Sequence, residues 1–312
     1  MPVKSRFQYN IATGRITLPA AILVSVAVGL ANITHWTDIF SLAVCALTAY
    51  LLIEMNTAFA LIRTRTALPA AMFMTLYVSC PFLYTYSKEI WTPLLLLAAL
   101  FSLFRSYESK HASTTIFHAF LLLGMGSFLT PHILYFVPLL YAIMGSLRSL
   151  NPRTFFAGLM GILTPYWILL CYHLYFSDTL KDVYSPFQEA IHFSAIDYSA
   201  ITLPQAVSVL IIFLIAAVGS IQGLMSAYQE KVQTRILLRS LIFTEAGVLL
   251  LACLQPQHLN TLLPVFLAIG SVMSGHLFAL TFNRFTRICF PAVLALGGFV
   301  CLFNLWMHLF KS

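Results

Sequence analysis

Charged side chains are scarce in this sequence. Only 9% of the 312 residues are Asp, Glu, Lys or Arg, whereas 60% are hydrophobic. A soluble globular domain carries roughly 25% charged residues, and no water-soluble fold could bury so much apolar surface. The composition therefore excludes a soluble enzyme or binding domain and predicts an integral membrane protein.

Signatures of several soluble site classes are also missing. The six cysteines lie in apolar stretches, with no CxxC pair and no metal-ligand spacing, so they are expected to be small buried hydrophobic residues. No GxGxxG, GxxxxGKS/T, HExxH or GxSxG pattern is present, which argues against an ATP-driven machine working alone. No cofactor is evident, although carboxylates could hold a divalent cation, and the sequence leaves the metal unknown.

Long apolar runs predict an all-α fold, a polytopic bundle of transmembrane helices. A helix needs roughly 20 apolar residues to cross the hydrocarbon core, because every backbone polar group must be paired within the segment. No Gly/Ser-rich or charged linker divides the chain, so residues 1–312 are expected to form one membrane domain. About eleven spans are predicted, near residues 17–31, 39–61, 68–86, 90–104, 115–129, 133–147, 154–175, 204–222, 238–254, 259–281 and 288–310.

The fourth, fifth and sixth of these segments are short. Each has about 15 residues and reaches only about 22 Å of a core that is roughly 30 Å thick. The fifth and sixth are therefore either tilted crossing helices or a re-entrant pair. Gly124, Gly126 and Pro131 interrupt this region, either because a broken helix lines a cavity or because glycine lets two helices pack closely.

The basic residues predict the orientation. With the N-terminus in the cytoplasm and alternating spans, the cytoplasmic segments collect fourteen of the seventeen lysines and arginines, leaving only Lys88, Lys181 and Lys311 elsewhere. Short basic loops are retained on the cytoplasmic side, so this asymmetry indicates a cytoplasmic N-terminus. The net charge of +7 is then a topology signal and requires no nucleic-acid partner.

Two longer polar stretches connect the spans. Residues 223–239 carry basic side chains at four-residue spacing among apolar ones, which predicts an interfacial amphipathic helix on the cytoplasmic side. Residues 177–202 form the largest outer loop, which is acidic and rich in aromatics.

Ionisable residues inside the membrane are expensive and therefore mark candidate sites. Glu54 and Glu245 are the carboxylates within predicted spans, both toward the cytoplasmic end. Structural pairing with Arg63 or Arg239 is the main expectation, and coupling to a proton or an ion is the alternative.

The predicted outer face holds a second set of polar residues. A carboxylate there can act as a general base or hold a cation, and histidine or lysine can contact a phosphate or sugar. The alternative is that outer loops are polar because water touches them. Asp38 is the catalytic candidate, and the substrate-binding candidates are His35, Trp36, Lys88, His132, Asp178, Asp182 and His192. Gln255, Gln257 and His258 occupy another outer turn.

The middle third of the chain resembles a known group of proteins. Asn56-Thr57, Asn151-Pro152-Arg153 and Leu163-Thr164-Pro165-Tyr166, with Gly158 and Gly161 between the last two, look like a family of uncharacterised multi-spanning inner-membrane proteins of Bacteroidota bacteria. The resemblance covers residues 54–176 and implies a bacterial inner (cytoplasmic) membrane as the location.

More distantly, the layout is similar to the GT-C superfamily of polytopic glycosyltransferases. These enzymes use polyprenyl-phosphate-linked sugars and keep an acidic residue in the first outer loop, where this sequence has Asp38. Their early paired short spans with glycine and proline breaks correspond to Gly124, Gly126 and Pro131 here. The resemblance implies action on lipid-linked sugars or other envelope precursors, with Asp38 as base or cation ligand.

Two other functions stay open at this stage. A transporter or flippase would use Glu54 or Glu245 for coupling, although the sequence shows no clear inverted repeat. A membrane scaffold subunit would use its helices only to bind partner proteins, which the sequence does not identify. Whether the protein is an enzyme is therefore uncertain.

Overall fold

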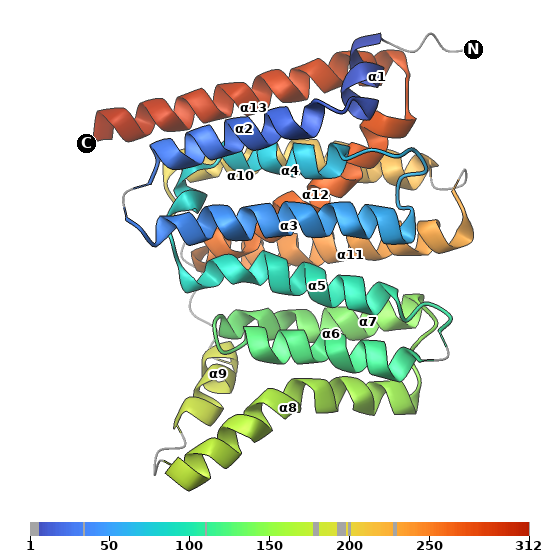
Figure 1. Ribbon diagram of the computed structural model, residues 1–312, viewed down its shortest axis with the longest axis vertical. Helices are drawn as coiled ribbons and strands as arrows, with labels where there is room; N and C mark the ends of the chain where they lie inside the picture. Colours follow the sequence, from blue (N-terminus) through green and yellow to red (C-terminus); the bar gives the residue numbers. More distant parts are fainter. Residues whose placement is uncertain are drawn as a thin grey trace. The chain divides into compact units, whose positions relative to one another are not determined.

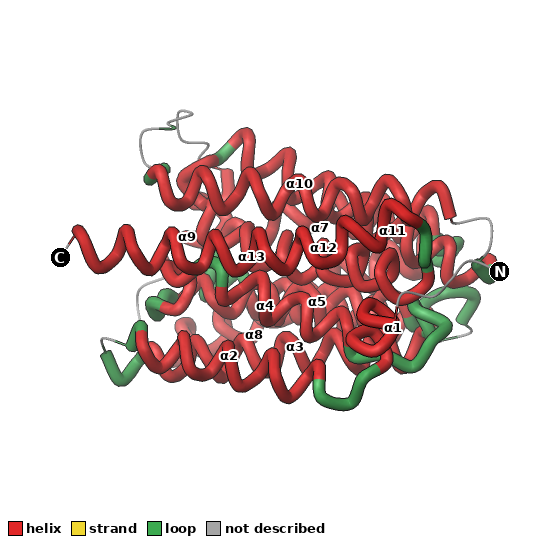
Figure 2. Tube along the Cα trace, turned by 90° about the horizontal axis from the view of Figure 1, so that it is seen from above, coloured by secondary structure: helices red, strands yellow, loops and turns green. Residues whose placement is uncertain are grey.

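A computed structural model describes residues 6–33, 35–109, 111–176, 181–191, 198, 201–226 and 230–311. Within these ranges the regular elements are all helices, joined by loops (Figure 2). The predicted all-α class is therefore confirmed for the described chain.

Each of the eleven predicted segments coincides with a helix. The hydrophobic runs locate the helices because a lipid-facing or core-facing helix is apolar along its length. The corresponding helices are α2 (Thr17–Ala31), α3 (Asp38–Phe59), α4 (Leu68–Val78), α5 (Thr92–Phe104), α6 (Ala112–Gly126), α7 (Phe136–Ser146), α8 (Pro152–Phe176), α10 (Leu203–Ser226), α11 (Val232–Leu254), α12 (Leu259–Leu280) and α13 (Arg284–Lys311). The other elements are α1 (Arg6–Thr13), α9 (Lys181–Ile191) and the 3-10 helices η1 (Pro81–Tyr84), η2 (Lys88–Trp91), η3 (Pro131–Tyr135) and η5 (Pro256–His258).

Six of the described helices are long and apolar enough to cross a membrane. The pair α1 and α2, bent by 79° at residues 14–16, makes a seventh if it is counted as one span. Large apolar side chains such as Leu23, Ile168 and Leu302 remain exposed along the helices, as a lipid-facing surface requires. These helices are compatible with a polytopic membrane protein. The helices α4, α5, α6 and α7 have 11 to 15 residues, fewer than the roughly 20 that a helix needs to cross the hydrocarbon core.

Three helices end at a proline turn of the same design. Cys80, Thr130 and Gln255 have extended φ angles of −119°, −142° and −134°, and each precedes a proline that begins a 3-10 helix. A residue before proline is pushed out of the helical region, so the break is local in origin. The predicted continuous span 68–86 is wrong in this respect, because α4 stops at Val78 and η1 follows.

The helices form two compact units. One unit contains Met1–Ser87, Asp197–Glu245 and Leu263–Ser312, and the other contains Lys88–Ile196 and Ala246–Leu262. We call them unit 1 and unit 2 and describe each by itself.

In unit 2, helix α6 packs against α5 and α8, and the three lie side by side in Figure 1. The contact between α6 and α8 is close because it uses glycine. A Cβ at Gly124 would lie 2.7 Å from the carbonyl oxygen of Ile162, and one at Gly161 would lie 2.6 Å from that of Phe117. Helix α6 continues through Gly124, so close packing is the role that the structure shows for this residue.

In unit 1, α2 and α3 pack against α4, and α10 packs against α13. Helix α10 runs to Ser226 and α11 begins at Val232. The separate interfacial helix predicted over residues 223–239 is therefore wrong, because α10 and α11 extend into this stretch from both sides.

Candidate functional site

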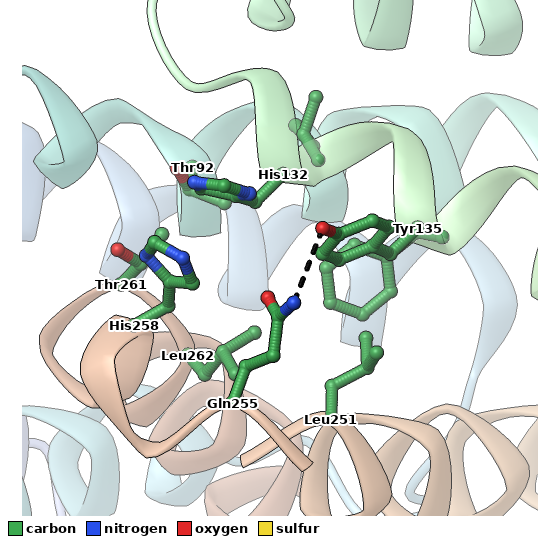
Figure 3. Close-up of a pocket in the computed structure, with 10 residues that line it drawn as sticks. Thr92, His132, Tyr135, Leu251, Gln255, His258, Thr261 and Leu262 are labelled. Carbon is green, nitrogen blue, oxygen red and sulfur yellow. Dashed lines mark hydrogen bonds between the residues drawn. The ribbon is translucent and has the colours of Figure 1, made fainter. Parts of the chain in front are cut away.

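A polar pocket lies in unit 2, where three turns of the chain meet (Figure 3). The N-terminus of α5 contributes Thr92, η3 contributes His132 and Tyr135, and the turn between α11 and α12 contributes Gln255 and His258. The pocket encloses about 280 Å³ of empty space, part of which is open to solvent. Its remaining walls are Ile133, Phe136, Leu251, Thr261 and Leu262.

The proline turns place the two histidines. His132 directly follows Pro131, and His258 lies two residues after Pro256. Each proline ends the preceding helix and starts a tight 3-10 turn, so both side chains project from a helix end rather than from a helix face.

The two imidazole rings stack on each other. Their centroids are 3.5 Å apart, with an angle of 35° between the ring planes. His132 lies between the predicted spans 115–129 and 133–147, and burial, followed by the charge of the neighbouring His258, lowers its pKa to about 4. His132 is therefore neutral near pH 7, with one ring nitrogen that donates and one that accepts a hydrogen bond.

Two polar atoms of the pocket have no hydrogen-bond partner. They are Nδ1 of His132 and Oε1 of Gln255, and both are buried. The amide nitrogen of Gln255 donates to the Tyr135 hydroxyl at 3.4 Å, so this amide is oriented with its oxygen free (Figure 3). Buried polar atoms nearly always have a hydrogen-bond partner. Two buried polar atoms without one, in the same pocket, therefore indicate a place where a polar group of a ligand binds.

The edge of the pocket is fixed by hydroxyl contacts. Thr92 and Thr130 share a hydrogen bond of 3.0 Å, which joins α5 to the end of α6. The Thr261 hydroxyl donates to Oε2 of Glu89, which joins α12 to η2. Glu89 is thus a carboxylate at the edge of the pocket, and a carboxylate there favours a neutral or hydroxylated ligand over an anion.

Helix α9 covers the turn that carries His132. It packs against η3 and α8, with Pro186 and Ala190 buried and the Phe187 ring 4.4 Å from that of Tyr166. Part of the long loop predicted over residues 177–202 is therefore an ordered helix beside the pocket. Asp178 and His192 lie outside the described residues, as does the side chain of Asp182.

The first predicted outer loop belongs to unit 1. Asp38 is 3% exposed, and its two carboxylate oxygens accept hydrogen bonds from the backbone N–H groups of His35 at 3.0 Å and Tyr86 at 2.9 Å. It thus ties the turn before α3 to the segment after η1. His35 is exposed and Trp36 is 88% exposed. The geometry supplies a structural role for Asp38, and its role as a catalytic base stays a proposal.

The remaining predicted residues lie in different settings. Lys88 is exposed at the start of η2. Glu54 is half-buried on α3 and accepts a hydrogen bond of 3.2 Å from the Tyr50 hydroxyl. Glu245 is buried near the middle of α11 and not, as expected, toward one end of it, and that helix begins at Val232 rather than at the predicted residue 238.

Glu245 is contacted by α10. Its Oε2 accepts a hydrogen bond from the Ser220 hydroxyl, while its Oε1 has no partner. A Cβ built on Gly270 of α12 would lie 3.6 Å from that Oε1. The expected pairing of Glu245 with an arginine is not what the described residues show.

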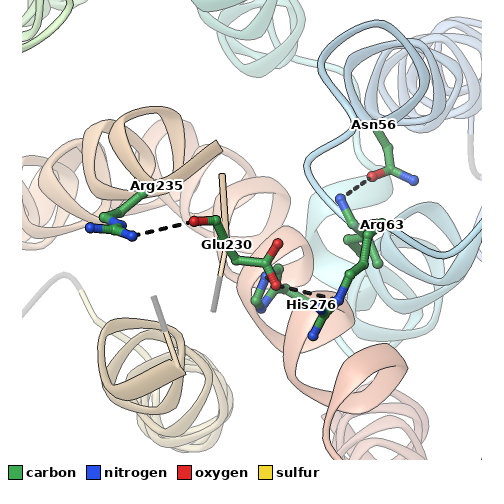
Figure 4. Close-up of polar contacts among 6 residues, drawn as sticks. Asn56, Arg63, Glu230, Arg235 and His276 are labelled. Carbon is green, nitrogen blue, oxygen red and sulfur yellow. Dashed lines mark hydrogen bonds and ion pairs between the residues drawn. The ribbon is translucent and has the colours of Figure 1, made fainter. Parts of the chain in front are cut away.

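A second polar cluster connects three segments of unit 1 (Figure 4). The Glu230 side chain is 7% exposed, and its Oε1 lies 3.6 Å from Arg63 Nε and 3.9 Å from His276 Nε2. Arg235 donates to the backbone carbonyl of Glu230 at 3.3 Å. Asn56 supports the turn before α4 by accepting the N–H of Ile62 at 2.9 Å. Arg63 therefore pairs with Glu230, and this pair holds the residues just before α11 against the turn between α3 and α4.

Among the residues of the two clusters, His132 was predicted from the sequence, whereas several others were missed. His276 is an ionisable residue inside the predicted span 259–281, and the argument applied to Glu245 would have found it. Thr92, Tyr135 and Glu89 carry no signal in the sequence, because their partners lie far away along the chain. Among the described residues, no three His, Cys, Asp or Glu side chains gather as they would around a metal ion.

The lowered pKa of His132 predicts a dependence of stability on pH. Between pH 6.5, the ordinary pKa of histidine, and about pH 4, His132 is protonated in the unfolded chain but neutral in the folded pocket. Above pH 6.5 this group has no effect, and stability falls as the pH drops below 6.5 and levels off below about 4. The melting temperature in detergent should therefore fall less between about pH 7.5 and pH 5 in His132→Gln than in the wild type. Substitution of the exposed His35 by Gln is the control and should leave the difference unchanged.

Comparison with protein-family models, curated proteins and solved structures finds no match to this chain. The site is therefore interpreted from its own geometry and chemistry.

Proposed function

We propose that this chain is a multi-pass protein of a bacterial inner membrane that binds lipid-linked sugars or other envelope precursors at its outer face. The distribution of basic residues supports a cytoplasmic N-terminus and eleven crossings. In that orientation, η2, η3 and η5 all lie on the outer side, so the pocket faces the compartment where such precursors are used.

The observation that carries the proposal is that two buried atoms of the pocket, His132 Nδ1 and Gln255 Oε1, have no hydrogen-bond partner. The interior of the pocket has room for roughly one water-sized group. A hydroxyl has that size, and it can donate to Gln255 Oε1 while it pairs with His132 Nδ1. The pocket offers neutral imidazoles, an amide and hydroxyls. These groups bind a sugar hydroxyl better than a phosphate, because strong binding of a phosphate requires cationic side chains. The phosphate and the lipid chain would then lie outside the pocket.

The transfer chemistry in this proposal rests on the similarity to GT-C enzymes. In it, Asp38 is the base or cation ligand, with His35 and Trp36 beside it, and a divalent cation assists. Lys88, Asp178, Asp182 and His192 contribute to substrate binding together with His132. Within unit 2, helix α9 covers the turn that carries His132.

The proposal predicts that Gln255→Leu weakens binding of a lipid-linked sugar. Leucine keeps the approximate volume of glutamine but removes the acceptor, so a bound hydroxyl would lose about 1 to 3 kcal/mol. Retention of an added short-chain polyprenyl-phosphate monosaccharide, measured by native mass spectrometry on detergent-purified protein, should fall about tenfold. His132→Phe should have a similar effect because phenylalanine keeps the ring stack.

The matched control is Gln257→Leu, in the same turn but exposed and outside the pocket lining. It should retain the lipid-linked sugar as the wild type does. Equal retention by all three variants and the wild type would refute the pocket. The protein would instead be a scaffold subunit if no polar substitution in either unit changed any activity and if the protein copurified with a larger complex.

A second candidate function is transport, either of a solute or of a lipid across the bilayer. It is favoured by Glu245, a buried carboxyl group in the middle of an apolar helix with one oxygen unpaired. Such a group can exchange a proton or a cation during a transport cycle.

A further inference from the structure

Unit 1 has an apolar groove that the proposed function does not use. It has two overlapping parts, with about 1,050 Å³ and 840 Å³ of empty space, each partly open to the surroundings. The parts share Val24 on α2, Met72 and Thr75 on α4, and Leu294 on α13, so they form one continuous channel. Helix α4 packs against both α2 and α13, and thus forms the floor between two walls.

One end of this groove is polar and the rest is apolar. Asn10, Arg15 and Thr17 line the end near the bend between α1 and α2. Beyond them the lining passes through Ala20 and Val24 and reaches Val28 on α2. The opposite wall ends at Leu302 on α13.

The polar end is held in a defined shape. Helix α1 is turned by 79° from α2, so it runs nearly along the bilayer surface if α2 crosses the bilayer. The Gln8 side chain anchors α1 by donating to the carbonyl oxygens of Phe278 at 2.8 Å and Thr281 at 3.0 Å. The Thr17 hydroxyl donates to the Ile11 carbonyl at 2.6 Å and closes the bend. Arg15, at this bend, therefore lies at the depth of lipid head groups.

The length of the groove corresponds to one leaflet. From Thr17 to Val28, α2 rises by about 16 Å, at 1.5 Å per residue. The hydrocarbon core is roughly 30 Å thick, so the groove extends from the head-group region to about the middle of the bilayer. A cation at the head-group end and apolar walls over one leaflet match a lipid with a negatively charged head group.

We infer that this groove binds an anionic glycerophospholipid from the leaflet on the side of the N-terminus. One acyl chain lies between α2 and α13 on the floor formed by α4, and the head-group phosphate pairs with Arg15. The inference uses only unit 1 and does not depend on the proposed function of the pocket in unit 2.

Native mass spectrometry of the full-length protein tests this inference, with phosphatidylglycerol and phosphatidylcholine as probes. The wild type should retain phosphatidylglycerol in preference to phosphatidylcholine by about tenfold, because the choline cation of phosphatidylcholine neutralises its own phosphate and Arg15 then gains less from pairing with it. Arg15→Gln should lose this preference. Ala20→Phe, which fills the exposed lining of α2, should lose retention of both lipids.

Two variants are the matched controls. Arg65→Gln removes another exposed arginine of unit 1 that does not line the groove, and Ala27→Phe enlarges an exposed alanine of α2 outside the lining. Both should behave as the wild type does. A wild type with no preference between the lipids would overturn the inference, and so would equal effects of Ala20→Phe and Ala27→Phe, which would indicate general lipid contact. Crosslinking by phosphatidylglycerol with a photoreactive acyl chain should label α2, α4 and α13.

Discussion

Replacement of Gly161 by leucine is expected to lower the melting temperature of the detergent-purified protein by about 10 °C and to reduce its amount in the membrane. Even a Cβ at this position would lie 2.6 Å from the carbonyl oxygen of Phe117 and 3.1 Å from the backbone nitrogen of Leu121. These are backbone atoms of α6 and cannot rotate away, so the two helices must separate. Overpacking of this kind costs about 3 kcal/mol, and each kcal/mol corresponds to about 2 to 4 °C.

The control is Gly145→Leu on α7 of the same unit. A Cβ there has no atom within 4 Å, and the residue is exposed, so the change should alter the melting temperature by less than about 2 °C. Gly161→Ala should fall between the two variants, because alanine adds the clashing Cβ but no further atoms. If Gly161→Leu melted as Gly145→Leu does, the close packing of α6 and α8 would be disproved.

The positions of eleven helices could be predicted from the sequence, whereas those of α1 and α9 and several helix ends could not. The run from Leu68 onward is apolar well past Val78, and hydrophobicity alone cannot show that Cys80 leaves the helical region before Pro81. Hydrophobicity also placed the start of α11 at residue 238 instead of Val232, because the basic residues in the first turns of this helix resemble those of a loop. This shift lengthens α11 by six residues at its N-terminal end, so Glu245 lies thirteen residues from the start of its helix and nine from its end.

The pocket could be predicted only in part. His132 was predicted as a site residue because it follows the Pro131 break, and His258 was only placed in an outer turn together with Gln255 and Gln257. The stacking of the two histidines depends on how η3 and η5 approach each other within unit 2, which one sequence does not encode in any local pattern. Glu230 was missed for the same reason, because only its buried contact with Arg63 and His276 distinguishes it from a solvated loop residue.

The transport candidate leads to the second large effect, which concerns Glu245. If this carboxyl group exchanges a proton or a cation during transport, Glu245→Gln should lower the transport rate by about tenfold or more. Glutamine has nearly the same shape, and its amide oxygen can still accept the hydrogen bond from Ser220, but it cannot ionise. The variant should therefore fold normally and fail only in coupling.

Two assays on reconstituted vesicles measure this effect. Internal pyranine reports proton uptake driven by an imposed potential, and dithionite quenching reports the movement of fluorescently labelled phosphatidylglycerol between leaflets. The matched control is Glu54→Gln, because Glu54 is half-buried and bonded to Tyr50 on its own helix. This variant should transport as the wild type does, although the sequence alone placed both glutamates in the same class.

The outcomes separate the two candidate functions. A rate lost in Glu245→Gln but kept in Gln255→Leu would assign the activity to the intramembrane carboxyl group of unit 1. Normal transport in Glu245→Gln would exclude that group from coupling, and an inactive wild type would remove the transport candidate itself. In the latter case the unpaired oxygen of Glu245 would only destabilise the folded protein. Glu245→Leu should then raise the melting temperature, because a buried acid without a full set of partners stabilises the fold less than an apolar side chain of similar volume.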